Sequence, residues 1–346
     1  MRAIRQRLAT WRLSHHVAEH QQELERCPCC TSAELEFLFD ANDLSTYFLV
    51  DRRLKRGRYS LCLHCGTTFS ARRPLPEVVS AYYDLFPELE NKDHQTYPPP
   101  SRNSKGKVAT AVEIMRLLDE RGLLRPDAAI LHIRCDAGAL LTRLRDRMPD
   151  ATLHGLDYFE ANVRYVREEG FAQVARQNPA AIELPFETSY DVILANHLFT
   201  HALDPRGDIA RLRAALKPGG RIVIYNEVDH QLLLDPASEL YTRLDVINYH
   251  KQLFVQQTFE SFLRNAGFAF DPLGHRRFTF GYVITPDDTV APAPAVSPGF
   301  LDRQRRLIGD WQKSATRYRY VLAAAQTLQA WRKRRIRSVR QKRARA

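Results

Sequence analysis

The order of apolar and polar residues changes character along the chain. From residue 106, segments with apolar side chains at helical spacing alternate with short runs of consecutive apolar residues. Such runs are typical of strands that are buried on both faces, so the alternation predicts a mostly parallel sheet with helices on both sides. The predicted helices are KVATAVEIMRLLDERGLL, ALLTRLRDRM, EANVRYVREEG and PRGDIARLRAALKPGG, and the predicted strands are AAILHI, ATLHGLD, YDVILAN and RIVIYNE.

Other patterns flank this region. EFLFDANDL and RYSLCLH predict a strand pair near the N-terminus, and Pro76–Leu85 predicts a short helix. A polar, proline-rich stretch follows, and a second proline-rich stretch comes before a helical pattern that includes Leu307, Trp311, Tyr318, Leu322 and Ala325. The predicted organisation is a basic N-terminal helix at 1–25, a small module at 26–90, a linker at 91–105, the α/β domain at 106–285, a Pro/Ala linker at 286–299 and a basic helical extension at 300–346.

Charge is concentrated at the two ends. The net charge is +11, but residues 311–346 hold twelve Lys/Arg and residues 1–13 hold four, with no Asp or Glu in either segment. The body is therefore mildly acidic, which argues against a groove for nucleic acid. The basic ends, with their tryptophans, could contact an anionic membrane, or the tail could dock on the main domain with a solvated end. No apolar run is long enough for a membrane span or a secretory signal, so we expect a cytoplasmic protein. Its basic tail could bring it to the inner face of the membrane.

Four of the six cysteines form two CxxC pairs, Cys27 with Cys30 and Cys62 with Cys65. Two such turns can direct four thiolates at one tetrahedral Zn²⁺, and a site with four protein ligands is structural. The pairs therefore predict a structural zinc site in the N-terminal module. Two alternatives stay open for the ligand set: His64 could replace a thiolate, and Cys29 could compete with Cys30.

Ligands of parallel α/β sheets bind beyond the carboxyl ends of the strands. The residues at these ends are Arg134 to Gly138, Asp157, Asn196 to His201 and Asn226 to His230. Asp157 ends the second strand about twenty residues after the first loop, where an acidic residue accepts hydrogen bonds from ribose hydroxyls. It could equally cap the helix EANVRYVREEG.

One family combines these features. The segments CPCC, YSLCLHCGTTFSARRPLPEVVSAYYD, GLDYFEANVRY, LPFETSYDVILANHLFTHALDP, LKPGGRIVIYNE and HKQLFVQQTFESFLRNAGF, over residues 26–285, resemble class I S-adenosylmethionine-dependent methyltransferases with an N-terminal zinc-binding module. This bacterial group contains the sugar C-methyltransferases. The resemblance implies a Rossmann-like domain with a mostly parallel seven-stranded sheet, S-adenosylmethionine as cofactor, structural Zn²⁺, and an acceptor pocket that the module helps to form, to which Tyr82 and Tyr83 could contribute.

The first loop departs from the family. Its pattern resembles D-x-G-x-G-x-G, and ILHIRCDAGAL places His132, Arg134, Asp136 and Gly138 at the four positions, so that one glycine is left. Side chains at glycine positions normally fill the space of the ligand. Alternatively, Arg134 could bind the cofactor carboxylate and Asp136 could face a cationic group of the cofactor. The candidate cofactor-binding residues are His132, Arg134, Asp136, Gly138, Asp157, Asn178 and Asn196.

Methyl transfer from a sulfonium needs alignment and, for a hydroxyl or carbon acid, a base. His201 follows the fourth strand, and His250 matches the second histidine of a YHEHLSYF-like stretch of the sugar C-methyltransferases. His230 and Glu227 are further candidates, after the fifth strand. The prediction is a methyltransferase that acts on a sugar, glycan precursor or related small polar acceptor. The alternative is a degenerate homologue that acts as a binding or scaffold protein, at an anionic membrane or with a partner in glycan synthesis.

Overall fold

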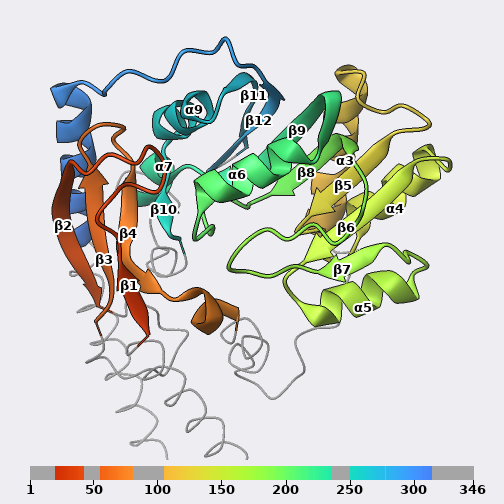
Figure 1. The fold of residues 1–346 in the computed structure, drawn as a ribbon, viewed down its shortest axis with the longest axis horizontal. Coiled ribbons are helices and arrows are strands. Elements are labelled where there is room, and N and C mark those ends of the chain that lie inside the picture. The colour runs from red at the N-terminus through yellow and green to blue at the C-terminus, as the bar shows by residue number, and fades with distance from the viewer. Residues whose placement is uncertain (1–19, 43–54, 81–104, 236–249, 277, 314–346) are drawn as a thin grey trace, which may run out of the picture.

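The fold contains two sheets that lie next to each other (Figure 1). It was obtained as a computed structural model that describes residues 20–42, 55–80, 105–235, 250–276 and 278–313. The smaller sheet comes mainly from the N-terminal module, and the larger sheet is the centre of the α/β domain. Tyr82, Tyr83, residues 91–104 of the predicted linker, and the basic ends at 1–19 and 314–346 lie outside the described residues.

The N-terminal sheet has the order β1-β4-β3-β2, with all neighbours antiparallel. The strands are β1 (Gln21–Glu23), β2 (Leu35–Asn42), β3 (Lys55–Cys62) and β4 (Thr68–Pro74). The predicted strand pair is confirmed as β2 and β3. The helix predicted over residues 1–25 is wrong at its end, because residues 21–23 pair with β4 as a strand. There the Glu23 carboxylate forms ion pairs with Arg58 and Arg72.

The α/β domain adds a strand of its own to this sheet. β10 (Gln252–Leu253) pairs antiparallel with β4. The backbone of Ser70 also donates to the carbonyl of Lys251 at 2.8 Å. The boundary predicted between the module and the domain is therefore crossed by main-chain hydrogen bonds.

The larger sheet has the order β11-β12-β9-β8-β5-β6-β7. Its strands are β5 (Ala129–Ile133), β6 (Thr152–Asp157), β7 (Val174–Arg176), β8 (Tyr190–Asn196), β9 (Leu216–Val228), β11 (Phe268–Arg276) and β12 (Thr279–Pro286). The five strands from β9 to β7 are parallel, and β12 and β11 are antiparallel additions at one edge. The predicted Rossmann-like fold with a mostly parallel seven-stranded sheet is confirmed.

Helices cover both faces of the larger sheet. α3 (Lys105–Glu120) and α4 (Ala139–Arg147) pack on one face, while α6 (Pro205–Ala214) and α9 (Gln256–Asn265) pack on the other. Within β5, Ile130 packs on the face covered by α3 and α4, whereas Leu131 and Ile133 pack on the face covered by α6 and α9. Successive side chains of a strand point to opposite faces of the sheet. The shorter helices are α5 (Glu160–Glu168), beside β6 and β7, and α7 (His230–Leu234).

The C-terminal extension begins with a helix at residues 298–313, where the described part of the chain ends. This helix lies against the N-terminal sheet, away from the larger one (Figure 1). Ile308 and Trp311 are buried against Tyr59 of that sheet and also against Leu234 and Leu253 of the α/β domain. This segment therefore contacts the main domain, as predicted, as well as the N-terminal sheet.

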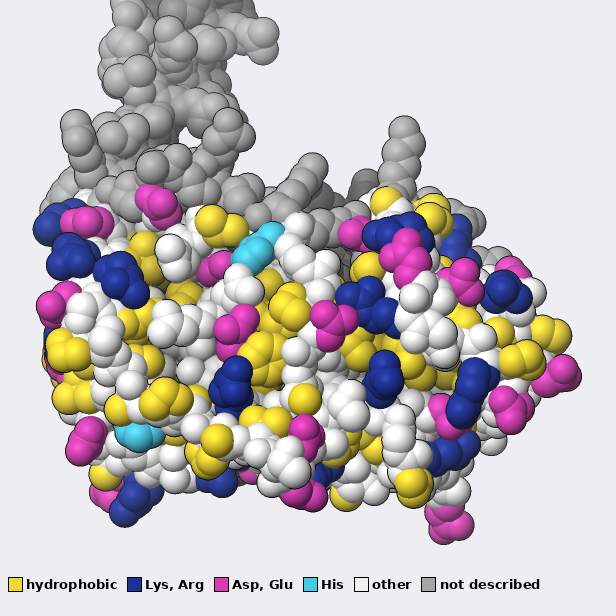
Figure 2. Space-filling model, turned by 90° about the horizontal axis from the view of Figure 1, so that it is seen from above, with side chains coloured by type: hydrophobic (Ala, Val, Ile, Leu, Met, Phe, Trp, Pro, Cys, Tyr) yellow, Lys and Arg dark blue, Asp and Glu magenta, His cyan; other side chains and the backbone are white. Residues whose placement is uncertain are grey.

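The described surface carries charges of both signs. On the face in Figure 2, basic and acidic side chains are interspersed among apolar ones. None of the helices in the described ranges combines the length and the apolar character needed to span a membrane.

Candidate functional site

The site lies at the edge of the larger sheet where the parallel strands end. β5, β6, β8 and β9 run in the same direction, so the residues that follow them meet there. The strand-end candidates from the sequence are brought together at this edge, and α3 adds residues that the sequence did not single out.

The loop after β5 keeps the backbone of a glycine-rich loop without the glycines. Arg134, Asp136 and Gly138 have φ angles of 56°, 54° and 74°. A non-glycine residue in this left-handed region costs about 1–2 kcal/mol, so surrounding contacts must hold it there. The amide of Cys135 donates to Leu156 at 3.0 Å, and the amide of Asp136 donates to Asp157 at 2.9 Å.

Asp157 holds this loop to the start of α5. One carboxylate oxygen accepts the Asp136 amide, and the other accepts the Phe159 amide at 3.0 Å and the Asn162 side chain at 2.9 Å. Burial raises the pKa of Asp157. The N-cap position of α5 is Phe159, which has no side-chain cap hydrogen bond, so the capping alternative for Asp157 is wrong. Its contact with a ribose stays a prediction.

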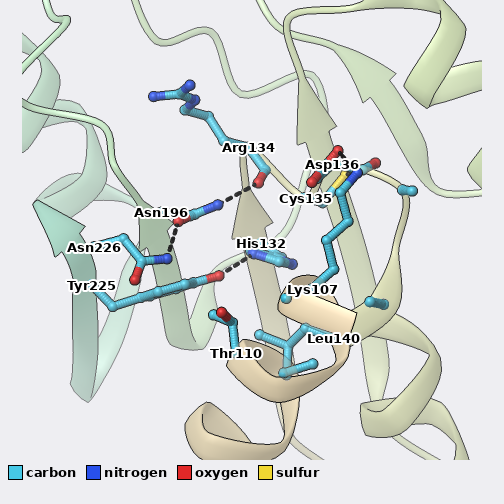
Figure 3. A pocket seen from close by; sticks show the side chains of 14 residues that line it. Lys107, Thr110, His132, Arg134, Cys135, Asp136, Leu140, Asn196, Tyr225 and Asn226 are labelled. Carbon is cyan, nitrogen blue, oxygen red and sulfur yellow. Dashed lines mark hydrogen bonds and ion pairs between the residues drawn. The ribbon is translucent and has the colours of Figure 1, made fainter. Parts of the chain in front are cut away.

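The Arg134 side chain crosses the strand ends. Its guanidinium donates to the backbone carbonyl of His197 and lies over the ring of Tyr158, 5.3 Å from the ring centroid. Figure 3 shows it directed away from Lys107 and Asp136. In this arrangement the guanidinium is already engaged, and it covers the space between the ends of β6 and β8.

A pocket of about 190 Å³ lies below this loop, against the start of α3. The Lys107 ammonium and the Asp136 carboxylate pair across it at 2.7 Å. Asn196 donates to the carbonyl of Arg134 at 3.2 Å and accepts from Asn226 at 2.9 Å. Figure 3 shows these side chains around the pocket. The pocket therefore presents a cation, an anion and amide groups within one small volume.

His132 forms the buried floor of the pocket. Its Nε2 lies 2.6 Å from the hydroxyl oxygen of Tyr225, and its Nδ1 has no partner among the described residues. Burial lowers the pKa of His132 to about 3, so the ring is neutral at pH 7. An unpartnered buried nitrogen is costly, and a ligand in the pocket could satisfy it.

The buried state of His132 makes stability depend on pH. A histidine whose pKa is about 3 in the folded chain and 6.5 in the unfolded chain stabilises the fold above pH 6.5, and this contribution is lost as the pH falls. Relative to His132→Gln, we expect the wild-type free energy of unfolding to fall by about 1.4 kcal/mol for each pH unit below this value. Urea unfolding of both proteins at a series of pH values measures the difference, and a difference independent of pH would contradict the assignment.

Four histidines gather beside the pocket. His230 Nε2 lies 2.7 Å from His250 Nδ1, and His201 Nε2 lies 3.0 Å from His197 Nε2. The ring centroids of His201 and His250 are 4.9 Å apart. The three histidines predicted as catalytic candidates are thus neighbours, and His197 joins them. Burial lowers the pKa of His250 and His197 well below the ordinary value, and that of His230 to about 4.

Glu227 does not fit the predicted role of a base. It is fully buried, and its oxygens accept the amides of Leu198, Phe199 and Thr200 as well as the Thr200 hydroxyl. Four donors leave the carboxylate no position for a substrate proton. Glu227 instead fixes the turn that carries His197 and His201.

The side chain of Asn178 is also engaged in hydrogen bonds within the protein. Its side-chain oxygen accepts from Ser80 at 3.2 Å and from the Ala180 amide at 2.9 Å, and its nitrogen donates to Glu183 at 2.8 Å. It is absent from the described lining of the pocket. Asn178 joins the loop after β7 to the N-terminal module, and its role as a cofactor ligand stays a prediction. Gly138 has its own structural role, because a Cβ there would lie 3.1 Å from Val166.

The cysteines form the second candidate centre. The sulfur atoms of Cys27, Cys30, Cys62 and Cys65 all lie within 4.8 Å of one another, with Cys27 to Cys65 at 3.7 Å and Cys30 to Cys62 at 3.5 Å. Tetrahedral coordination at a Zn–S distance of about 2.3 Å places sulfur atoms about 3.8 Å apart. The chain therefore brings together four thiols that could hold a metal ion, and neither Cys29 nor His64 belongs to this set.

Comparison with known proteins assigns the larger domain. Residues 105–272 match a family model described as a methyltransferase domain. Together with the strand order of the sheet, this match decides the class. Residues 105–272 form a class I S-adenosylmethionine-dependent methyltransferase domain.

The relatives of the methyltransferase domain differ in substrate. An O-methyltransferase of Penicillium expansum is 30% identical over 146 residues, which are 40% of this chain and 51% of that protein. A malonyl-[acyl-carrier protein] O-methyltransferase of Halalkalibacterium halodurans is 30% identical over 131 residues, which are 33% and 45% of the two chains. The chain thus spans about half the length of the curated relatives it matches.

Solved methyltransferase structures resemble the chain at low identity. The magnesium protoporphyrin IX methyltransferase of Synechocystis PCC 6803, with bound S-adenosylhomocysteine, is 14% identical, with a TM-score of 0.41 and coverage of 61% of this chain and 99% of that one. An O-methyltransferase family protein of Burkholderia thailandensis is 16% identical, with a TM-score of 0.41 and coverage of 64% and 79%. Similarities of this size say nothing of the substrate.

Two residues of the methyltransferase domain's site were missed from the sequence. Lys107 was read only as part of a helix, and Tyr225 only as part of a strand. His197 lies in the predicted strand-end range Asn196 to His201 but was not singled out there, although it precedes His201 by four residues, a spacing that can bring two side chains together.

Proposed function

We propose that this chain is an S-adenosylmethionine-dependent methyltransferase, and that the pocket below loop 134–138 binds the methionine end of the cofactor. The observation that carries the proposal is the Lys107–Asp136 pair across the pocket, at 2.7 Å. The methionine end bears a carboxylate and an ammonium group. A lysine and an aspartate placed side by side can receive these two charges in charge-assisted hydrogen bonds.

The chain itself supplies recognition and proton transfer. Bound S-adenosylmethionine supplies a methyl group activated by its sulfonium. On the protein side, Asn196 orients the loop through the carbonyl of Arg134. His132, whose buried Nδ1 has no partner among the described residues, lines the pocket. His201 and His250 lie next to this region, and a neutral imidazole can accept the proton of an acceptor hydroxyl. His230 contacts His250 and so positions its ring.

Calorimetric titration of the full chain with S-adenosylmethionine and S-adenosylhomocysteine tests the proposal. Lys107→Gln should weaken the binding of both ligands by about 10- to 100-fold, because it removes one charge-assisted hydrogen bond. Lys217→Gln is the matched control, since Lys217 pairs with Asp191 at the other end of β8 and should leave affinity unchanged. Equal affinities for Lys107→Gln and the unsubstituted chain would contradict this placement of the cofactor.

The acceptor belongs to the same proposal. We propose a sugar, a glycan precursor or a related small polar molecule, supported by the resemblance of the cysteine module and of the stretch at His250 to the sugar C-methyltransferases. Structural Zn²⁺ at Cys27, Cys30, Cys62 and Cys65 is part of it, supported by the spacing of their sulfur atoms. Peripheral contact of the basic tail with an anionic membrane, and a cytoplasmic location, stay predictions.

One observation favours the alternative of a degenerate binding or scaffold protein. The Arg134 guanidinium covers the space between the ends of β6 and β8, through its contacts with Tyr158 and the carbonyl of His197. If neither cofactor nor product binds in the titration above, the loop is closed and this alternative replaces the enzyme.

A further inference from the structure

Three of the four clustered histidines have the arrangement of metal ligands. One ring nitrogen each of His197, His201 and His250 lies within 4.8 Å of the other two. The closest pair, His197 Nε2 and His201 Nε2, is 3.0 Å apart. Two Nε2 ligands on one tetrahedral Zn²⁺, at about 2.0–2.1 Å from the ion, lie about 3.3–3.4 Å apart. The nitrogens thus already stand close to the separation that a shared ion requires.

The backbone holds these histidines in place. His197 has a φ angle of 50°, its amide donates to the carbonyl of Tyr225 at 2.9 Å, and its own carbonyl accepts from Arg134. Glu227 fixes the next three residues through their amides. A strained backbone held by so many contacts is typical of a functional site.

The third histidine is fixed from the other module. The hydroxyl of Tyr59, in β3, donates to the carbonyl of His250 at 2.9 Å, and the amide of Lys251 donates to the carbonyl of Thr200 at 2.8 Å. The same Thr200 is bound to Glu227. The segment that carries His197 and His201 is therefore hydrogen-bonded to the segment that carries His250, so the three rings are preorganised.

Hydrogen bonds also set the tautomer of His250. His230 Nδ1 lies 2.9 Å from the carbonyl oxygen of Phe254, which can only accept, so Nδ1 carries the hydrogen. In the neutral ring His230 Nε2 is then an acceptor, and His250 Nδ1, 2.7 Å away, donates to it. The lone pair of His250 is thereby placed on Nε2, the nitrogen that would bind the ion. A partner that fixes the tautomer of a ligating histidine is the usual outer shell of a metal site.

We infer that His197, His201 and His250 bind a divalent transition-metal ion, for which Zn²⁺ is the expected ion. Imidazole suits Zn²⁺, Cu²⁺ and Ni²⁺ better than the harder Mg²⁺ or Ca²⁺. Three histidines leave the ion a further position for water or for an oxygen of a small molecule. This site is separate from the four cysteines and goes beyond the proposed methyl transfer, which does not require it. A ring nitrogen that binds the ion cannot also accept a proton, so in the metal-bound chain His201 and His250 hold the ion and do not serve as the base.

Cobalt separates the two centres by spectroscopy. The full chain, stripped with a chelator and kept reduced, is titrated with Co²⁺ as the probe. We expect two equivalents to bind: one gives thiolate-to-cobalt charge-transfer absorption from the cysteines, and the other gives only weak visible absorption, as nitrogen and oxygen ligands do. His201→Gln should abolish the second equivalent and retain the charge-transfer band of the first, which also shows that the chain is folded. His197→Gln should do the same.

The matched control is His275→Gln, which removes a histidine outside the cluster, paired with Asp229 at 3.1 Å. It should keep both equivalents. Binding of one equivalent by the unsubstituted chain, or a second equivalent that survives in both His201→Gln and His197→Gln, would overturn the inference and leave the histidines as a hydrogen-bonded relay. Since no cofactor is present in the titration, its result does not depend on whether the chain transfers methyl groups.

Discussion

Replacing Cys62 with serine should remove one equivalent of zinc and unfold the N-terminal sheet. Cys62 is fully buried and ends β3, and its sulfur lies 3.5 Å from that of Cys30. A structural zinc site contributes directly to folding, and in zinc-finger peptides the contribution is about 10–16 kcal/mol. Loss of one ligand should therefore cost several kcal/mol and lower the temperature of thermal unfolding. Metal analysis of the purified chain and calorimetric unfolding measure the two effects.

Cys29→Ser is the matched control for this change. Cys29 is as deeply buried as the cluster, but its sulfur is not among the four grouped atoms, while its amide donates to the sulfur of Cys27 at 3.4 Å. The backbone contact survives the substitution, so zinc should be retained. Zinc retained in Cys62→Ser would refute the four-cysteine site, and zinc lost in Cys29→Ser would put Cys29 among the ligands.

The second large effect concerns Arg134. Arg134→Gly should strengthen the binding of S-adenosylmethionine by about 10- to 100-fold, because the cofactor would no longer have to displace the guanidinium from Tyr158 and from the carbonyl of His197. Glycine also accepts the φ angle of 56° without strain. Calorimetric titration of both chains with S-adenosylmethionine measures the change.

Arg134→Lys is the matched control for this prediction. It keeps a long cationic side chain in the same backbone conformation, so it should not gain affinity comparable to that of the glycine variant. Weaker binding by Arg134→Gly would mean that the guanidinium itself holds the cofactor carboxylate, as the sequence first suggested.

The regular part of the fold was predictable because its signals are local. Burial on both faces forces runs such as AAILHI, and β5 follows that run within one residue. The N-terminal sheet was only half predictable, since β1 and β10 are short and owe their conformation to pairing with β4. Such pairing depends on residues far away in the sequence, which no local pattern reports.

The site shows the same division. The sequence places Asp157 and Glu227 at strand ends and gives Asn178 as a further candidate, but it cannot show which of their oxygens are already occupied. In the structure all three accept backbone amides: Asp157 from the loop after β5, Glu227 from the turn after β8, and Asn178 from its own loop. The absence of glycines predicted a loop with a different conformation. In the structure, the contacts of Asp157 and Leu156 hold Arg134 and Asp136 at the positive φ angles that glycines would adopt there. Which hydrogen-bond acceptors are already in use, and which backbone conformation a loop is held in, depend on contacts between residues far apart in the sequence.

The pairing of β10 with β4 limits how this chain can be rearranged. β10 begins two residues after His250, and the same short segment is bonded to β4 on one side and to the turn of Thr200 on the other. The helix at 298–313 adds a second link, because Gly66 of the cysteine module packs so closely against the ring of Phe300 that a Cβ at position 66 would clash with it. A chimera that grafts this module onto another methyltransferase would have to carry residues 250–253 and the C-terminal helix with it. In engineering terms, the two modules form a single unit of exchange.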